Sequence, residues 1–160
     1  MSRNEFIGIA EMKVTGDPES VLIAPNLGSC VAVSVFDPAT RRGGMIHCLL
    51  PLSNSDPEKA KLNPAMYVDV GVPRLLESVL SGGSDKKKLI IIAAGGANIN
   101  DDRNVFEIGK KNSTVLKKIM WKNNLLFRAE SFGEDYSRTL SLDIQTGKTY
   151  LKAKGVTTEL

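Results

Sequence analysis

Six consecutive apolar residues, Leu89 to Ala94 (LIIIAA), run directly into the pair Gly95-Gly96. A short continuous apolar run that ends at glycine is typical of a strand buried on both faces, which needs a covering layer on each side. Neither of the common glycine-rich phosphate-binding spacings is present, so the two glycines predict a tight turn from strand to loop.

The rest of the chain mixes strand and helix patterns and contains no internal repeat. Pro73 either kinks the first predicted helix or divides it, and the polar, proline-bearing segment 52–63 predicts a long loop. We therefore expect one domain over 1–160, with an α/β or α+β fold built on a mixed sheet. Further strands are expected at 20–24, 30–36, 43–50, 125–130, 139–143 and 148–153, and helices at 64–80 and 107–123.

Composition argues against several classes of protein. Two cysteines and one histidine are too few for a disulfide scaffold or a structural zinc site, so neither a metal nor a cofactor is expected. The sequence has no run long enough for a membrane span and no signal-peptide pattern, which predicts a cytoplasmic protein with reduced thiols. The net charge of +3 comes from scattered basic residues without interleaved aromatics, which argues against nucleic-acid binding.

A predicted hairpin brings the histidine and one cysteine together. If residues 37–40 (DPAT) form its loop, Cys30 lies directly opposite His47. Directly opposite residues share a face of the sheet, with Cβ atoms about 4.5 to 5.5 Å apart. The other face carries Cys48 among valines, where it is expected to be a small core residue. A register slip of one residue separates Cys30 from His47.

Two interpretations of Cys30 remain open from the residues alone: a nucleophile or a buried filler. An adjacent imidazolium is expected to lower the pKa of a thiol and to protonate a leaving amine. Main-chain N–H groups of Gly28, Ser29 and Cys30 are candidates for stabilising an oxyanion, since glycine permits a tight turn there.

Five blocks of sequence, in this order along the chain, resemble the CheD family of chemoreceptor glutamine deamidases. They are LGSCVAVSVFDP (27–38), GGMIHCLLP (43–51), YVDVGVPRLL (67–76), AGGA (94–97) and IGKKN (108–112).

The resemblance implies an α/β sandwich, with mixed sheets flanked by helices, that is related to toxin-type cysteine deamidases. It implies an enzyme that hydrolyses glutamine side-chain amides of methyl-accepting chemotaxis receptors to glutamate and releases ammonia; some members also hydrolyse receptor methyl esters. Cys30 matches the family's cysteine, and His47 matches its histidine.

Three positions depart from the family pattern. A threonine that orients the histidine in many members is replaced by Ala24, so a nearby backbone carbonyl, Asn26 or Ser29 is expected to take its place. Asn100 stands in a segment that is usually apolar. The loop before Arg138, a candidate substrate contact, is poorer in glycine than usual.

Two other functions compete with catalysis. The family includes partners of CheC-type chemotaxis phosphatases, so a chain without the orienting threonine is also interpretable as a non-catalytic regulator that binds such a phosphatase. A redox-sensing thiol is the third possibility, and it lacks a resolving cysteine beside Cys30.

Overall fold

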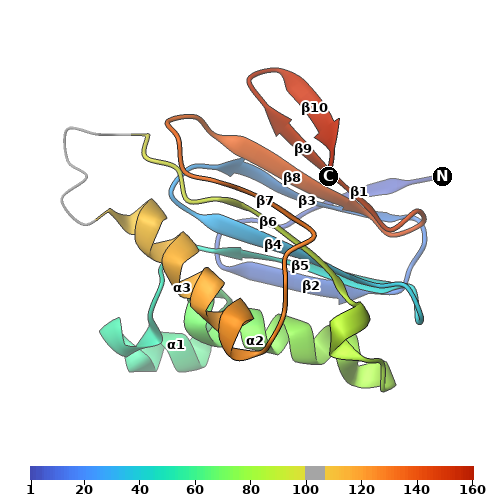
Figure 1. Ribbon diagram of the computed structural model, residues 1–160, viewed down its shortest axis with the longest axis horizontal. Coiled ribbons are helices and arrows are strands. Elements are labelled where there is room, and N and C mark those ends of the chain that lie inside the picture. The colour runs from blue at the N-terminus through green and yellow to red at the C-terminus, as the bar shows by residue number, and fades with distance from the viewer. Residues whose placement is uncertain (100–106) are drawn as a thin grey trace.

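The computed structural model describes residues 1–99 and 107–160 and arranges them in three layers. Two five-stranded sheets stack on each other, and the helices cover the outer face of the second sheet (Figure 1). The first sheet has the order β1-β3-β8-β9-β10 and the second β2-β5-β4-β6-β7. The strands are β1 (Arg3–Phe6), β2 (Glu11–Thr15), β3 (Ser20–Leu27), β4 (Val31–Asp37), β5 (Arg42–Cys48), β6 (Ile90–Gly95), β7 (Ala129–Phe132), β8 (Arg138–Asp143), β9 (Lys148–Ala153) and β10 (Val156–Glu159), and the α-helices are α1 (Pro57–Leu62), α2 (Val68–Val79) and α3 (Ile108–Lys122).

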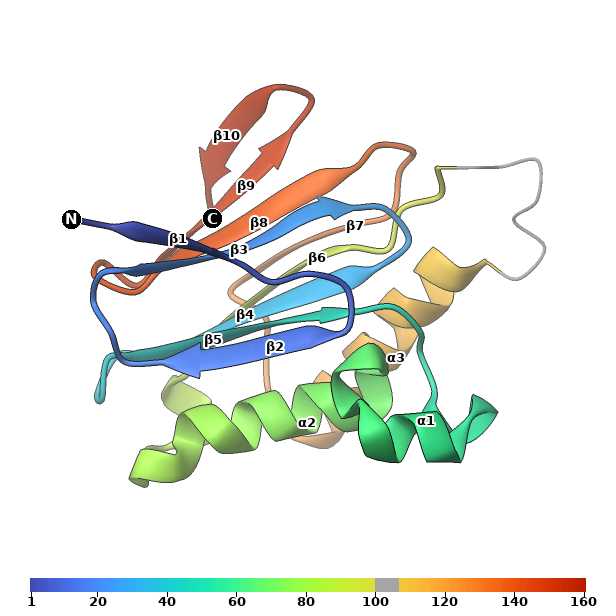
Figure 2. The same ribbon diagram turned by 180° about the vertical axis from the view of Figure 1, so that it is seen from behind.

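Both sheets are mixed. β1 pairs with β3 and β6 pairs with β7 in parallel, while the other neighbours are antiparallel. Seen from behind, β1 and β2 follow each other along the chain but belong to different sheets, so the turn between them crosses one edge of the sandwich (Figure 2). The predicted α/β fold with mixed sheets and flanking helices is confirmed.

The second sheet separates two hydrophobic cores. Its outer face packs on α2 and α3 through Val33, Ile46, Leu75 and Leu116, and its inner face meets the first sheet through a separate apolar cluster. The predicted doubly covered strand is β6, in which every residue after the first is buried. Burial of these two apolar faces is the main force that holds the layers together.

Several element predictions needed correction. The segment predicted as a loop contains α1, which begins at Pro57 after an Asp56 side chain that accepts the Lys59 N–H. α2 runs unbroken through Pro73, and the chain turns instead at Tyr67, which is extended. β1, β2 and β10 were not predicted.

The predicted hairpin forms with a register two residues away from the expected one. Its last pair is Asp37 with Arg42, so His47 lies opposite Ala32 rather than Cys30. Arg41 adopts a left-handed backbone (φ 60°), which lets the turn close one residue later than expected. Because side chains alternate with period two, a shift of two leaves every face assignment unchanged.

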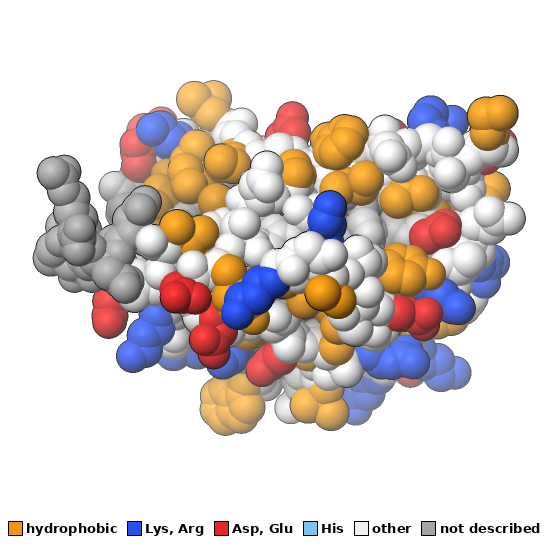
Figure 3. Space-filling view, turned by 90° about the horizontal axis from the view of Figure 1, so that it is seen from above, with side chains coloured by type: hydrophobic (Ala, Val, Ile, Leu, Met, Phe, Trp, Pro, Cys, Tyr) orange, Lys and Arg blue, Asp and Glu red, His pale blue; other side chains and the backbone are white. Residues whose placement is uncertain are grey.

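Charged and apolar side chains are interspersed on the face seen from above in Figure 3, and no single charge sign dominates it. Among the described residues, the helices all fall short of the length and apolar character that crossing a membrane requires.

Candidate active site

Cys30 and His47 both lie on the inner side of the second sheet. Cys30 immediately precedes β4 and belongs to the core between the sheets, together with Ala32 and Met45. Since His47 is paired with Ala32, Cys30 is its diagonal neighbour. Diagonal neighbours in an antiparallel ladder are about 7 to 8 Å apart at Cα, which long or aromatic side chains can span.

The His47 ring is held in one tautomer. Its Nδ1 lies 2.9 Å from the carbonyl oxygen of Ile7, and because a carbonyl only accepts, Nδ1 carries the proton and donates it. Nε2 is therefore the nitrogen with a free lone pair. It is buried and has no hydrogen-bond partner within residues 1–99 and 107–160. Burial lowers the pKa of His47, so the ring is neutral near pH 7.

A short turn between β1 and β2 supplies the acceptor for His47. The Ile7 N–H donates to Ile23 in the first sheet, and the Ala10 N–H donates to the His47 carbonyl in the second. The Glu11 carboxylate closes the turn by accepting the Gly8 N–H at 2.6 Å. Sequence reasoning missed these residues, although the alternation of Met12 and Val14 with polar neighbours was a signal for β2.

Cys30 is a buried thiol, 6% exposed. Burial raises its pKa, and a hydrogen bond from its own main chain opposes this only in part. The expected lowering of the thiol pKa by an imidazolium was wrong for this state of the protein. Cys48 is completely buried in the helical core, and burial raises its pKa much further, which confirms its assignment as a core residue.

The loop that carries Cys30 is fixed through its carbonyl groups. The Gly28 carbonyl accepts the Ala97 N–H, the Cys30 carbonyl accepts the Gly96 N–H, and the Ser29 carbonyl accepts the side-chain amide of Asn112. A Cβ on Gly95 would lie 2.1 Å from the Cys30 carbonyl oxygen, so only glycine allows this approach. β6 ends at Gly95, as the sequence predicts, and Gly95 and Gly96 both have positive φ (117° and 62°).

Neither Ala24 nor Asn26 supplies the hydrogen bond to His47 Nδ1. Ala24 is fully buried in β3, and Asn26 lies in a bulge of the same strand with a left-handed backbone (φ 53°). The Asn26 N–H donates to the Thr139 hydroxyl. A backbone carbonyl near Ala24 does accept from His47, as expected. It belongs to Ile7, which follows the pair of Phe6 with Ile23 and therefore lies beside Ala24.

Arg138 is directed into the protein. The residue is 2% exposed, and its guanidinium donates to the Ser131 hydroxyl and to the carbonyl groups of Gly133 and Tyr136. It also stacks on the Tyr136 ring, 4.4 Å from the centroid. These contacts brace the loop after β7, which in turn contacts the turn after β6, because the Gly133 N–H donates to Gly95. Asn100 lies outside the described residues.

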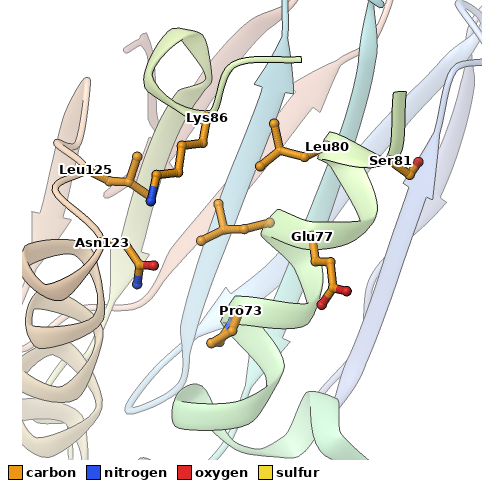
Figure 4. Close-up of a pocket in the computed structure, with 8 residues that line it drawn as sticks. Pro73, Glu77, Leu80, Ser81, Lys86, Asn123 and Leu125 are labelled. Carbon is orange, nitrogen blue, oxygen red and sulfur yellow. The ribbon is translucent and has the colours of Figure 1, made fainter. Parts of the chain in front are cut away.

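Of the hollows that lie away from the Cys30–His47 pair, two adjoin elements described above. One of ≈ 320 Å³ is lined by Gly96, Asn98, Lys117 and Gly133 among others, next to the turn that holds the Cys30 carbonyl. Another of ≈ 400 Å³ lies on the helical side between α2 and the end of α3 (Figure 4). Neither hollow is lined by Cys30 or His47.

The stacked pair of mixed sheets thus places a buried thiol and a histidine on one inner face. Comparison with known proteins gives the family. The model described as CheD chemotactic sensory transduction matches residues 49–153. The chain belongs to the CheD family.

Several relatives align over nearly the whole chain. A protein of Syntrophus aciditrophicus (strain SB) named "Probable chemoreceptor glutamine deamidase CheD 1" is 42% identical over 150 residues, 94% of each chain. A Solibacter usitatus (strain Ellin6076) protein named "Probable chemoreceptor glutamine deamidase CheD" is 42% identical over 155 residues, which are 97% of this chain and 92% of the relative.

Proposed function

We propose that residues 1–160 form one deamidase domain that hydrolyses glutamine side chains of methyl-accepting chemotaxis receptors in the cytoplasm. The names of the relatives support the substrate class. The observation that carries the chemistry is the tautomer of His47: its Nδ1–H is donated to Ile7, and the free lone pair of Nε2 lies buried on the side of the sheet that carries Cys30.

In the proposed first step, His47 acts as the general base. Nε2 removes the Cys30 proton as the sulfur attacks the amide carbon, so the thiolate forms only when substrate is present. The lowered pKa of His47 and the raised pKa of Cys30 suit this role, because both shifts favour a neutral imidazole and a neutral thiol before substrate binds. The imidazolium then protonates the leaving nitrogen, and ammonia departs as a thioester forms.

In the second step, the same histidine activates water. The hydroxide attacks the thioester carbon, the sulfur leaves, and the proton returns to Cys30 while the receptor side chain is released as glutamate. A methyl ester passes through the same thioester with methanol as the leaving group, so the proposal includes methylesterase activity.

We assign the oxyanion to N–H groups of the loop at Gly28, Ser29 and Cys30. The three carbonyls of this loop are bonded to the turn after β6 and to α3, which fixes the loop's orientation in advance of the reaction. Arg138 contributes indirectly in this proposal, because the loop that it braces supports the same turn.

The experiment incubates a purified receptor signalling fragment with the wild-type protein and follows conversion of glutamine to glutamate by peptide mass spectrometry. Cys30→Ala is expected to abolish conversion, and His47→Gln to lower the rate by about 10²- to 10⁴-fold. Cys48→Ala, which removes the other thiol from the opposite face, is the matched control and should retain activity when folded. Conversion by Cys30→Ala at the wild-type rate would refute the nucleophile.

A second candidate function is a non-catalytic regulator that binds a CheC-type phosphatase. The absence of a hydroxyl at Ala24 and the burial of the Cys30 thiol favour it. It predicts no conversion by the wild-type protein and equal binding of phosphatase by wild type and Cys30→Ala. Conversion that depends on Cys30 would exclude it as the sole function.

A further inference from the structure

Asn112, on the first turns of α3, connects the two segments that carry Cys30 and His47. It is completely buried, and its side-chain nitrogen donates to the carbonyl of Ser29 at 2.9 Å and to the carbonyl of Leu49 at 3.1 Å. Ser29 immediately precedes Cys30, and Leu49 follows His47 by two residues. Both partners accept, so the contacts fix which end of the amide is the nitrogen.

The bridge lies where the sheet stops holding these segments together. The ladder between β4 and β5 ends with the pair Val31 and Cys48. Beyond that pair, the Leu49 N–H turns away to Met66, and the Cys30 carbonyl turns to Gly96. One donor group on α3 therefore contacts both strands just past the end of their own pairing.

The other end of the same amide has no partner. Asn112 Oδ1 is buried and accepts no hydrogen bond within the described part of the chain. An unsatisfied buried acceptor is unfavourable, and a residue retained for packing alone would be better served by an apolar side chain of similar volume. The two donated hydrogen bonds are therefore the feature of Asn112 that needs explaining.

We propose that Asn112 is a positioning residue that sets the separation between the Cys30 segment and the His47 segment. By holding Ser29 and Leu49 on one nitrogen, it fixes how far the sulfur lies from Nε2 and how the N–H groups beside Ser29 are directed. The inference rests on the proposed Cys30–His47 chemistry, for which displacements of an ångström are costly.

Two variants distinguish the contribution of the Asn112 N–H donor from that of the side-chain shape. Asn112→Asp keeps the shape but turns the donor into an acceptor that faces two carbonyls, and Asn112→Ser has one donor proton for two carbonyls. Ser113→Ala is the matched control: it removes a hydrogen bond within the same helix, to the Lys110 carbonyl, and touches neither segment.

Hydrogen exchange, steady-state kinetics and Cys30 alkylation are measured on folded protein. In both Asn112 variants, exchange should rise together at the main-chain amides of 28–31 and 48–51. The kcat for receptor glutamine should fall about tenfold or more with KM within about threefold, Asp more than Ser. The pH profile of Cys30 alkylation should shift as well. Ser113→Ala should change none of these.

Three results would overturn the proposal: faster exchange in only one segment, Asn112→Asp with the kcat of the wild type, or Ser113→Ala with the same losses. If the wild-type protein converts no glutamine, the proposed function fails by itself. The exchange and alkylation measurements then still decide whether Asn112 couples the two segments.

Discussion

The two faces of the second sheet are built from alternate residues of the same strands, yet they support different chemistry. The outer face is closed by α2 and α3 and holds Cys48 among valines and leucines. The inner face holds His47, and Ser34, whose hydroxyl lies 3.0 Å from that of Thr149 in the first sheet. The outer face packs on the helices through apolar side chains, whereas the space between the two sheets also holds buried polar side chains that are hydrogen-bonded.

The two cysteines express this difference most directly. Both are buried, but Cys30 lies at the end of the inner face, in the loop before β4, whereas Cys48 is the last residue of β5 and faces the helices. Each of the following experiments tests whether the inner face of the second sheet holds the reactive groups and the outer face contributes only to stability.

Thiol labelling should show the largest effect. Iodoacetamide should modify Cys30 in the native protein, while Cys48 should react only from the unfolded fraction, at least about a thousandfold more slowly. Because burial raises the pKa of Cys30, its rate should still be rising above pH 8.5. Peptide mass spectrometry over time measures both rates, with Cys30→Ala as the control that leaves one slow thiol. Equal rates would contradict the assignment of the faces.

Acid should destabilise the protein through the inner face. His47 is buried with a lowered pKa, so as pH falls below about 6.5 the unfolded chain gains a proton that the folded chain does not. The free energy of unfolding should fall in that window by at most about 1.4 kcal/mol per pH unit, until the lower folded pKa is reached.

Urea unfolding from pH 7 to 5 measures this loss. His47→Gln should show a weaker pH dependence, because the titrating group is gone. Hydrogen bonds from basic partners lower the pKa values of carboxylates such as Glu5 and Asp17. These groups change the free energy of unfolding only below about pH 4.5, and they do so in both proteins. Identical slopes in the two proteins would show that His47 is not held neutral.

Substitutions of Glu11 should lower kcat moderately, because this residue acts on His47 in two ways. Its carboxylate holds Gly8 and so the turn that presents Ile7, and its charge raises the pKa of His47. Glu11→Gln keeps the acceptor and removes the charge, whereas Glu11→Ala removes both. We expect kcat to fall less than about threefold in Glu11→Gln and about tenfold in Glu11→Ala.

The pH profile distinguishes the two roles of Glu11. In Glu11→Gln the acid limb of kcat/KM should move to lower pH, since the imidazolium loses a favourable charge. Equal kcat values in Glu11→Gln and Glu11→Ala would mean that the turn does not depend on the carboxylate.

The sequence predicted the faces better than the register. Alternation alone places Cys48 outward and Cys30 inward, and a shift of two residues cannot change that. The register itself depends on Arg41 adopting a left-handed backbone. Glycine and asparagine are the residues that indicate such a conformation in a sequence, and position 41 has neither. The Cys30–His47 distance was therefore less predictable than the side of the sheet that the two residues share.

The orienting group was not predictable for a different reason. A hydroxyl or carboxylate can be recognised in a sequence, but every residue has a carbonyl, and only the turn between β1 and β2 brings that of Ile7 to His47. The same holds for Asn112, which is far in sequence from both segments that it joins. Such contacts depend on tertiary structure alone.

Ala24→Thr should have a small effect on turnover. Because Ile7 already accepts from His47 Nδ1, a hydroxyl at position 24 is not required, and turnover should change less than about tenfold, or under about 1.4 kcal/mol in the barrier. Ala24 is fully buried, so the added atoms should cost about 1 to 3 kcal/mol of stability through overpacking.

Ala24→Val is the matched control, because valine has the shape of threonine without the hydroxyl. If the two variants show the same turnover and the same loss of stability, the hydroxyl contributes nothing and the Ile7 carbonyl is sufficient. If Ala24→Thr alone gains turnover by more than about tenfold, the carbonyl is a poor substitute, and the inner face of this chain has lost part of its catalytic machinery. Turnover on one receptor fragment and urea unfolding of both variants decide between these outcomes.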